Sequence, residues 1–72
     1  MNREPVTSSN ITSIGYDADK SILEIEFNTG KIYQYEPVTA EGHLEFMKSD
    51  SIGSFFHKHI RGNDTLTVTK ID

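Results

Sequence analysis

The feature that most constrains this fold is a short segment in which apolar and acidic residues alternate. Through residues 22–27, Leu23, Ile25 and Phe27 fall on one face of an extended chain, and the acidic side chains between them fall on the other. A period of two is typical of a strand with one buried face. The segment therefore predicts a β-strand that covers a hydrophobic core.

A second alternating segment, 31–35, follows the polar stretch 28–30, which ends in glycine. A three-residue loop with its glycine in the left-handed region would pair Ile25 with Tyr33. That register brings both Tyr33 and Tyr35 onto the apolar face. A two-residue loop would instead place both tyrosines among the acidic residues. The first register is favoured because it keeps one face of the sheet apolar.

Two other segments carry strand signals. The spacing of Ile11, Ile14 and Tyr16 predicts a strand before the hairpin, and residues 66–71 alternate in the manner of a short strand at a sheet edge. Residues 1–9 are mostly polar, so we expect them to form a flexible tail.

Two helices are predicted between the hairpin and the C-terminal segment. Thr39 is a suitable N-cap for a helix that extends to about residue 48, with Leu44 and Met47 facing inward. After a second cap at Ser51, the segment 52–60 has apolar residues at positions i, i+3, i+4 and i+8. This one-sided stripe predicts a helix that packs on the sheet.

Together these segments predict an α+β fold. We expect a three-stranded antiparallel β-meander with two short helices on one face, and 66–71 is the candidate for a fourth, C-terminal edge strand. The 72 residues allow one domain, 10–72, after the tail 1–9. The chain has no cysteine, no signal-peptide pattern and no apolar run that could span a bilayer. We therefore expect a cytoplasmic protein that does not contact a membrane.

Charge and motif spacing argue against catalysis. Seven Lys and Arg against eleven Asp and Glu give a formal charge of −4, which disfavours long-range attraction to nucleic acid. His57 and His59 are two residues apart, whereas helical metal ligands are three or four apart. Glu24 and Glu26 lack apolar neighbours that would shift a pKa. We expect no catalytic residue, no metal site, no cofactor and no enzymatic activity.

The sequence Tyr33-Gln34-Tyr35 has two interpretations. Two rings on one strand face can stack with unpaired bases, as in sheet-based RNA-binding domains. Lys58 and Arg61 in the second predicted helix would then contact phosphates. In the other interpretation both rings are core residues beneath the helices. The sequence leaves both interpretations open.

The order and spacing of several motifs resemble those of a known family, the KTSC domain. The resemblance covers about residues 8–61. The motifs are Ser8-Ser9-x-Ile11, Ile14-Gly15-Tyr16-Asp17, Leu23-x-Ile25-x-Phe27-x-x-Gly30, Tyr33-x-Tyr35 and Ser51-x-Gly53-x-Phe55-Phe56-x-x-x-Ile60-Arg61. The family is named for the C-terminal extension of some lysyl-tRNA synthetases and also occurs as short stand-alone proteins in bacteria and phages.

We expect a non-enzymatic binding module, and the resemblance suggests RNA as its ligand because the family is attached to a synthetase. The resemblance carries over Tyr33 and Tyr35 from the central motif, Ser51 and Gly53 from the Ser-x-Gly motif, and Arg61. For Gly53 we also expect a structural reason, because close approach of the second helix to the sheet would need a residue without Cβ.

A second class of function would use the acidic residues. Asp17, Asp19, Glu24 and Glu26 are expected to be exposed, and they could form an acidic face that binds a protein. The chain would then be a protein-interaction module or a small phage-type inhibitor of a host protein. The sequence identifies neither the partner nor the oligomeric state.

Overall fold

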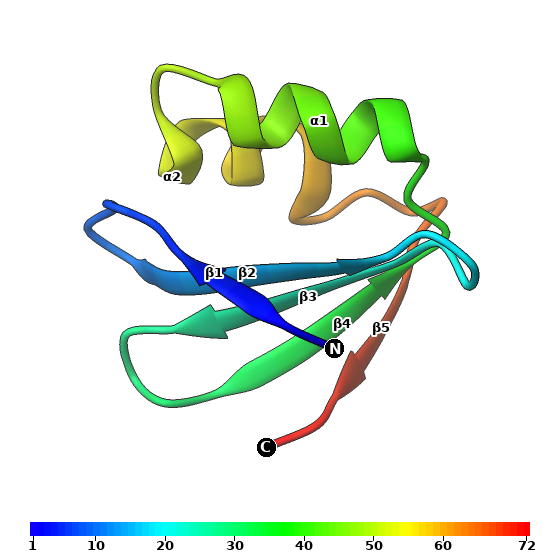
Figure 1. Cartoon of the computed structure of the whole chain (residues 1–72), viewed down its shortest axis with the longest axis horizontal. Helices are drawn as coiled ribbons and strands as arrows, with labels where there is room; N and C mark the ends of the chain where they lie inside the picture. Colours follow the sequence, from blue (N-terminus) through cyan, green and yellow to red (C-terminus); the bar gives the residue numbers. More distant parts are fainter.

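Five antiparallel strands form one sheet, and the helices cover one of its faces (Figure 1). The computed structural model describes residues 1–72. The strands are paired in chain order, from β1 at one edge to β5 at the other. The elements are β1 (Arg3–Pro5), β2 (Ile11–Asp17), β3 (Ile22–Phe27), β4 (Ile32–Glu36), α1 (Ala40–Lys48), α2 (Ile52–Phe55), the π-helical turn η1 (Phe56–Ile60) and β5 (Thr67–Lys70).

The central hairpin has the predicted register. Ile25 pairs with Tyr33, and Leu23 pairs with Tyr35. Gly30 has a φ angle of 90°, the left-handed conformation that the three-residue loop requires. Both tyrosines therefore lie on the face of the sheet that the helices cover.

A β-bulge explains the irregular apolar spacing in β2. The register between β2 and β3 shifts between Ile11 and Ser13. One extra residue at this point reverses the alternation. Ile11 and Ile14, which are three positions apart, are consequently both buried in the core.

The core lies between the sheet and the helical layer. Its buried hydrophobic residues are Ile11, Ile14, Leu23, Ile25, Tyr35, Phe46, Phe56 and Ile60. In α1 the prediction of an inward Leu44 was wrong, because Leu44 is 51% exposed and Phe46 is the buried residue. Phe46 and the half-buried His43 and Met47 lie three and four positions apart, so they define the inner stripe of the helix.

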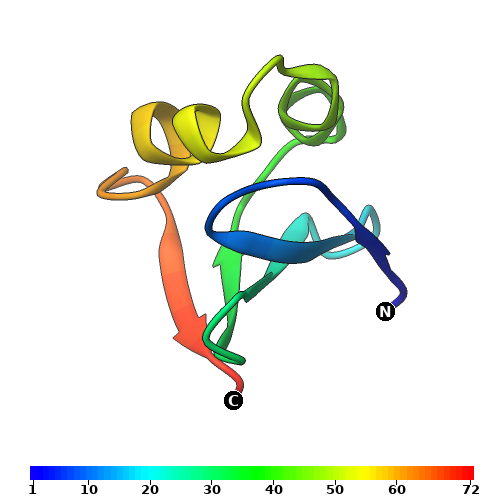
Figure 2. The same ribbon diagram turned by 90° about the vertical axis from the view of Figure 1, so that its left-hand side faces the viewer.

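Both predicted helix caps are present. The Thr39 side chain accepts a hydrogen bond from the Gly42 backbone N–H, and Ser51 accepts one from Ser54. α2 continues directly into η1, where the Arg61 N–H donates to the carbonyl of residue 56, five positions earlier. Figure 2 shows this segment beside α1 on the same side of the sheet. No helix has the length and apolar character needed to cross a membrane.

The predicted α+β class is confirmed, but the sheet has five strands rather than three or four. β5 is the expected C-terminal edge strand, whereas β1 lies where only a tail was predicted. β1 pairs with β2 and places Arg3 opposite Gly15. A Cβ on Gly15 would lie 2.9 Å from the Asn2 carbonyl oxygen, so this glycine makes room for the N-terminal segment. Because β1 is short and polar, hydrophobic alternation could not reveal it.

Candidate functional site

A groove of about 680 Å³ opens between the β3–β4 hairpin and the α2–η1 segment. Aromatic rings and nitrogen-bearing side chains line it together. The aromatic residues are Phe27, Tyr33, Tyr35 and Phe56, and the nitrogen-bearing ones include Lys31, His57 and Arg61. No aspartate or glutamate lines the groove. We call this cavity the aromatic groove.

The two tyrosines of β4 have different environments. Tyr35 is 6% exposed and packs edge-to-face with Phe56, with 5.8 Å between the ring centroids. Tyr33 is half-buried and makes an edge-to-face contact with Phe27, also at 5.8 Å. The core interpretation therefore applies to Tyr35, and Tyr33 is the residue whose ring is partly accessible in the groove.

The buried hydroxyl of Tyr35 is harder to ionise than that of an ordinary tyrosine. Burial raises the pKa of Tyr35 above its ordinary value of 10.0, and neighbouring Tyr33 acts in the same direction. The positive charge of Arg61 acts in the opposite direction but is outweighed. Tyr35 therefore stays protonated to a higher pH than an ordinary tyrosine.

The cationic residues of the groove have no carboxylate partner. Both ion pairs in the chain are made by Arg3, so Lys31 and Arg61 are unpaired. The Arg61 guanidinium contacts His57, whose Nδ1 lies 3.4 Å from Nη1. Although the whole chain is acidic, the lining of the groove contains Lys31 and Arg61 and no carboxylate.

The structure brings together only part of the predicted nucleic-acid set. Tyr33, Tyr35 and Arg61 line the same groove, whereas Lys58 is exposed on η1 outside it. The sequence did not point to Lys31 as part of this site. Lys31 directly follows the turn glycine, and its position at the end of the hairpin was the sequence signal that could have identified it.

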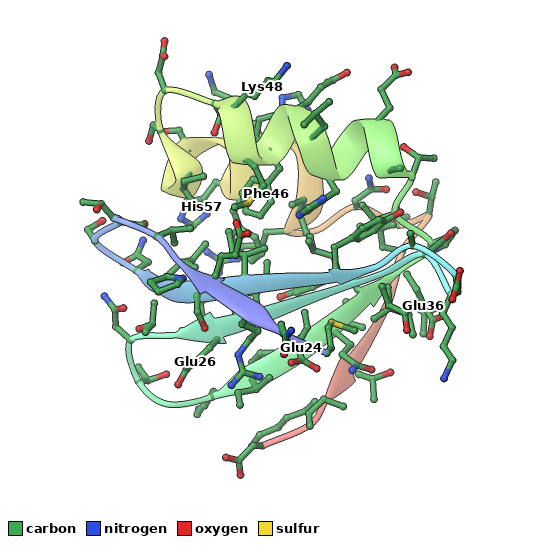
Figure 3. The ribbon with its side chains drawn as sticks, in the orientation of Figure 1. Glu24, Glu26, Glu36, Phe46, Lys48 and His57 are labelled. Carbon is green, nitrogen blue, oxygen red and sulfur yellow. The ribbon has the colours of Figure 1, made fainter.

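A smaller cavity of about 270 Å³ adjoins the groove and has mainly polar walls. It lies between the β1–β2 loop and the start of α2, and we call it the polar pocket. Ser9, Asn10, Gly53 and His57 line both cavities. In Figure 3, His57 extends from the helical segment toward the β1–β2 loop.

Gly53 and Ser51 of the family motif have separate places here. A Cβ on Gly53 would lie 3.6 Å from Ser8 Oγ, which is an ordinary van der Waals contact. The expectation that only glycine fits between the helix and the sheet was therefore wrong, because an added Cβ would meet only Ser8 of the β1–β2 loop, at an ordinary contact distance. Ser51 caps α2 and also lines the polar pocket.

The opposite face of the sheet carries a network of polar side chains. Arg3 Nη1 lies 2.6 Å from Glu24 Oε2, and Gln34 donates to Glu24 Oε1 at 2.8 Å. Ser13 donates to Glu26 at 2.8 Å and accepts from Arg3 Nε at 3.2 Å. Figure 3 shows Glu24 and Glu26 on the side of the sheet away from the helices. We call these five residues the open-face network.

This network contradicts the expectation of a freely exposed acidic face. Glu24 is 7% exposed and is bound by the side chain of Arg3 from β1, while Glu26 is half-buried. Asp17 accepts hydrogen bonds from the backbone N–H groups of Asp19 and Lys20 and so stabilises its own turn. Among the four acids, Asp19 alone is classed as exposed.

Opposing effects act on the ionisation of Glu24. Burial raises the pKa of the carboxyl, but hydrogen bonds from Gln34 and Arg3, together with the Arg3 charge, more than offset it. The pKa of Glu24 therefore lies below its ordinary value of 4.5. No group of three or more His, Asp or Glu side chains is placed to hold a metal ion.

Comparison with known proteins shows the family to which this fold belongs. The sequence model of the KTSC domain family matches residues 7–63. An uncharacterised protein from Stutzerimonas stutzeri is 40% identical over 58 residues, which cover 81% of this chain and 82% of that protein.

A similar fold has been solved experimentally. The crystal structure of a KTSC domain protein from Yersinia pestis matches with a TM-score of 0.92 and 44% sequence identity, covering 99% of this chain and 97% of the other. The agreement extends over the sheet and the helical layer alike. The chain belongs to the KTSC domain family.

Proposed function

We propose that this chain is a non-enzymatic binding domain for single-stranded nucleic acid, which it holds in the aromatic groove. The observation that carries the proposal is the composition of the groove. Aromatic rings and unpaired cationic side chains line it, and no carboxylate does. Single-stranded nucleic acids present the matching chemistry, since each nucleotide has a flat base and an anionic phosphate.

The aromatic and the cationic side chains bind different parts of the nucleotide. A base packs against the accessible part of Tyr33 and the neighbouring Phe27, whose rings are already in edge-to-face contact. Lys31 and Arg61 bind the adjoining phosphates, and the planar guanidinium can donate two hydrogen bonds to one phosphate group. A duplex would keep its bases stacked inside, so the groove favours an unpaired strand.

Because the chain has a net charge of −4, we expect its affinity for nucleic acid to depend strongly on the salt concentration. Repulsion from the rest of the chain weakens binding, while each phosphate contact strengthens it most at low ionic strength. For single strands, the logarithm of the affinity falls with the logarithm of the salt concentration with a slope of about −0.7 per phosphate contact.

The test is a fluorescence-anisotropy titration of a mixed-sequence single-stranded RNA at several salt concentrations. We expect Lys31→Ala combined with Arg61→Ala to reduce the affinity at least tenfold and to make the salt slope shallower by about 1.4. The matched control is Lys20→Ala combined with Lys58→Ala. It removes the same charge from two exposed residues outside the groove.

If only long-range attraction contributed, both double variants would lose RNA affinity by the same factor. That result would overturn the groove as the binding site. An unmodified protein that shows no binding at low salt would overturn nucleic-acid binding altogether. Circular dichroism of each variant verifies that the fold is retained.

A further inference from the structure

We infer that the polar pocket recognises the ribose of a bound nucleotide and makes the groove selective for RNA over DNA. The inference rests on the proposed function, because the pocket acts on a strand held in the aromatic groove. Its starting point is the continuity of the two cavities. They share Ser9, Asn10, Gly53 and His57, so the polar pocket directly adjoins the groove in which a nucleotide would bind.

The walls of the pocket have the hydrogen-bonding capacity that a sugar hydroxyl needs. Serine hydroxyls and the asparagine amide each both donate and accept. The oxygens of Ser8 and Ser51 already accept from the backbone N–H groups of Asn10 and Ser54, which fixes their positions. Their O–H groups remain as donors. The ribose 2′-hydroxyl is likewise a donor and an acceptor, and deoxyribose lacks it.

Charge separates the role of the pocket from that of the groove. Asp50 lines the polar pocket, while no lysine or arginine does. A carboxylate repels phosphate but accepts a hydrogen bond from a hydroxyl group. The phosphates of a bound strand therefore belong beside Lys31 and Arg61, and a neutral, hydroxyl-bearing part of the nucleotide belongs in the pocket.

Gly53 lies at the boundary of the two cavities. An added Cβ would lie 3.6 Å from Ser8 Oγ, an ordinary van der Waals contact, and Ser8 lines the polar pocket. Glycine at this position thus keeps the passage between the two cavities wide, although the packing of α2 does not require a glycine here. This is the role that we assign to the Gly53 of the Ser-x-Gly motif.

The experiment compares two oligonucleotides that differ only in the sugar, oligouridine and oligodeoxyuridine of equal length. Both contain the same base and the same number of phosphates, so only the 2′-hydroxyl distinguishes them. We expect the unmodified protein to bind the RNA at least about fivefold more tightly, the contribution of roughly one hydrogen bond. Asn10→Ala combined with Ser54→Ala removes polar groups from opposite walls of the pocket, and we expect the RNA-to-DNA affinity ratio to fall to about one.

Arg61→Ala is the matched control, because loss of a phosphate contact weakens both oligonucleotides and preserves their affinity ratio. Equal binding of the two oligonucleotides by the unmodified protein would overturn the inference and leave the proposed function standing. A preference for RNA that survives in the Asn10→Ala, Ser54→Ala variant would place sugar recognition elsewhere and would also overturn it. Binding of neither oligonucleotide would overturn the proposed function itself. A misfolded variant is recognised by its circular dichroism spectrum, and Asn10→Ala and Ser54→Ala are then measured singly.

Discussion

The two faces of the sheet use charge in opposite ways. On the open face, the carboxylates of Glu24 and Glu26 are bound by Arg3, Ser13 and Gln34 within the same chain. At the helix-covered face, Lys31 and Arg61 border the aromatic groove and have no acidic partner.

This difference separates structural charges from charges that are available to a ligand. A paired and nearly buried carboxylate stabilises the fold, and freeing it for a partner would break existing hydrogen bonds. An unpaired cation beside an aromatic ring makes no ion pair within the chain that a ligand would have to break. For that reason the groove, rather than the more numerous acidic residues, is the better candidate for binding.

The largest effect expected from a single substitution lies between the helices and the sheet. Phe46→Ala should cost about 3–5 kcal/mol, which is comparable with the whole stability of a domain of this size. Leu44→Ala, on the exposed side of the same helix, should change stability by about 0.5 kcal/mol or less. Thermal unfolding followed by circular dichroism compares the two, and equal losses would contradict the assignment of the helix face.

Removing the Tyr33 ring should have the next largest effect, and it acts on binding. Tyr33→Ala should weaken RNA binding by about 1–3 kcal/mol, the contribution of one stacked base. Tyr33→Phe keeps the ring and should bind nearly as well as the unmodified protein. Anisotropy titrations on samples with verified folding give both values. Equal losses in the two variants would show that the hydroxyl, and not the ring, makes the contact.

Substitution on the open face should affect stability and leave RNA binding intact. Glu24→Gln removes charge-assisted hydrogen bonds and should cost about 1–2 kcal/mol at pH 7. Because the pKa of Glu24 is lowered in the folded state, its contribution is complete well above pH 4.5 and is lost as the pH falls through the folded value.

The stability difference between the unmodified protein and Glu24→Gln should therefore narrow as the pH is lowered below 4.5. Urea denaturation at a series of pH values between 7 and about 3 measures the gap. A gap that stays constant through this range would mean that Glu24 is not held ionised by Arg3 and Gln34.

Gly53→Ala should have the smallest effect on stability and a clear one on binding. The added methyl group fits, and alanine is the better helix former, so stability should change by less than about 1 kcal/mol. The methyl group narrows the passage between the aromatic groove and the polar pocket, which should weaken RNA binding. Unchanged affinity would show that a bound strand does not pass this position.

Local patterns in the sequence were sufficient to predict much of the fold. The hairpin register follows from the alternation around Ile25 and Tyr33 and from the turn glycine. The helix starts follow from the capping side chains of Thr39 and Ser51. Each of these signals lies within a few residues of the structure that it specifies, so it can be recognised from the sequence alone.

The missed features depend on contacts between distant parts of the chain. β1 has no apolar pattern of its own, and its stabilising contact joins Arg3 to Glu24, two strands away. The groove is similar, because Lys31 and Arg61 come together only when η1 packs beside the hairpin. Single residues such as Tyr33 and Arg61 could be selected from motifs, but their common surface required the folded structure.

The most direct test is a two-dimensional amide NMR spectrum of the labelled protein with and without a mixed-sequence single-stranded RNA at low salt. We predict shifts that cluster around Asn10, Lys31, Tyr33 and residues 53–61, weaken as salt is added, and spare β1. Shifts confined to the open face, or a spectrum that RNA does not change, would contradict the account.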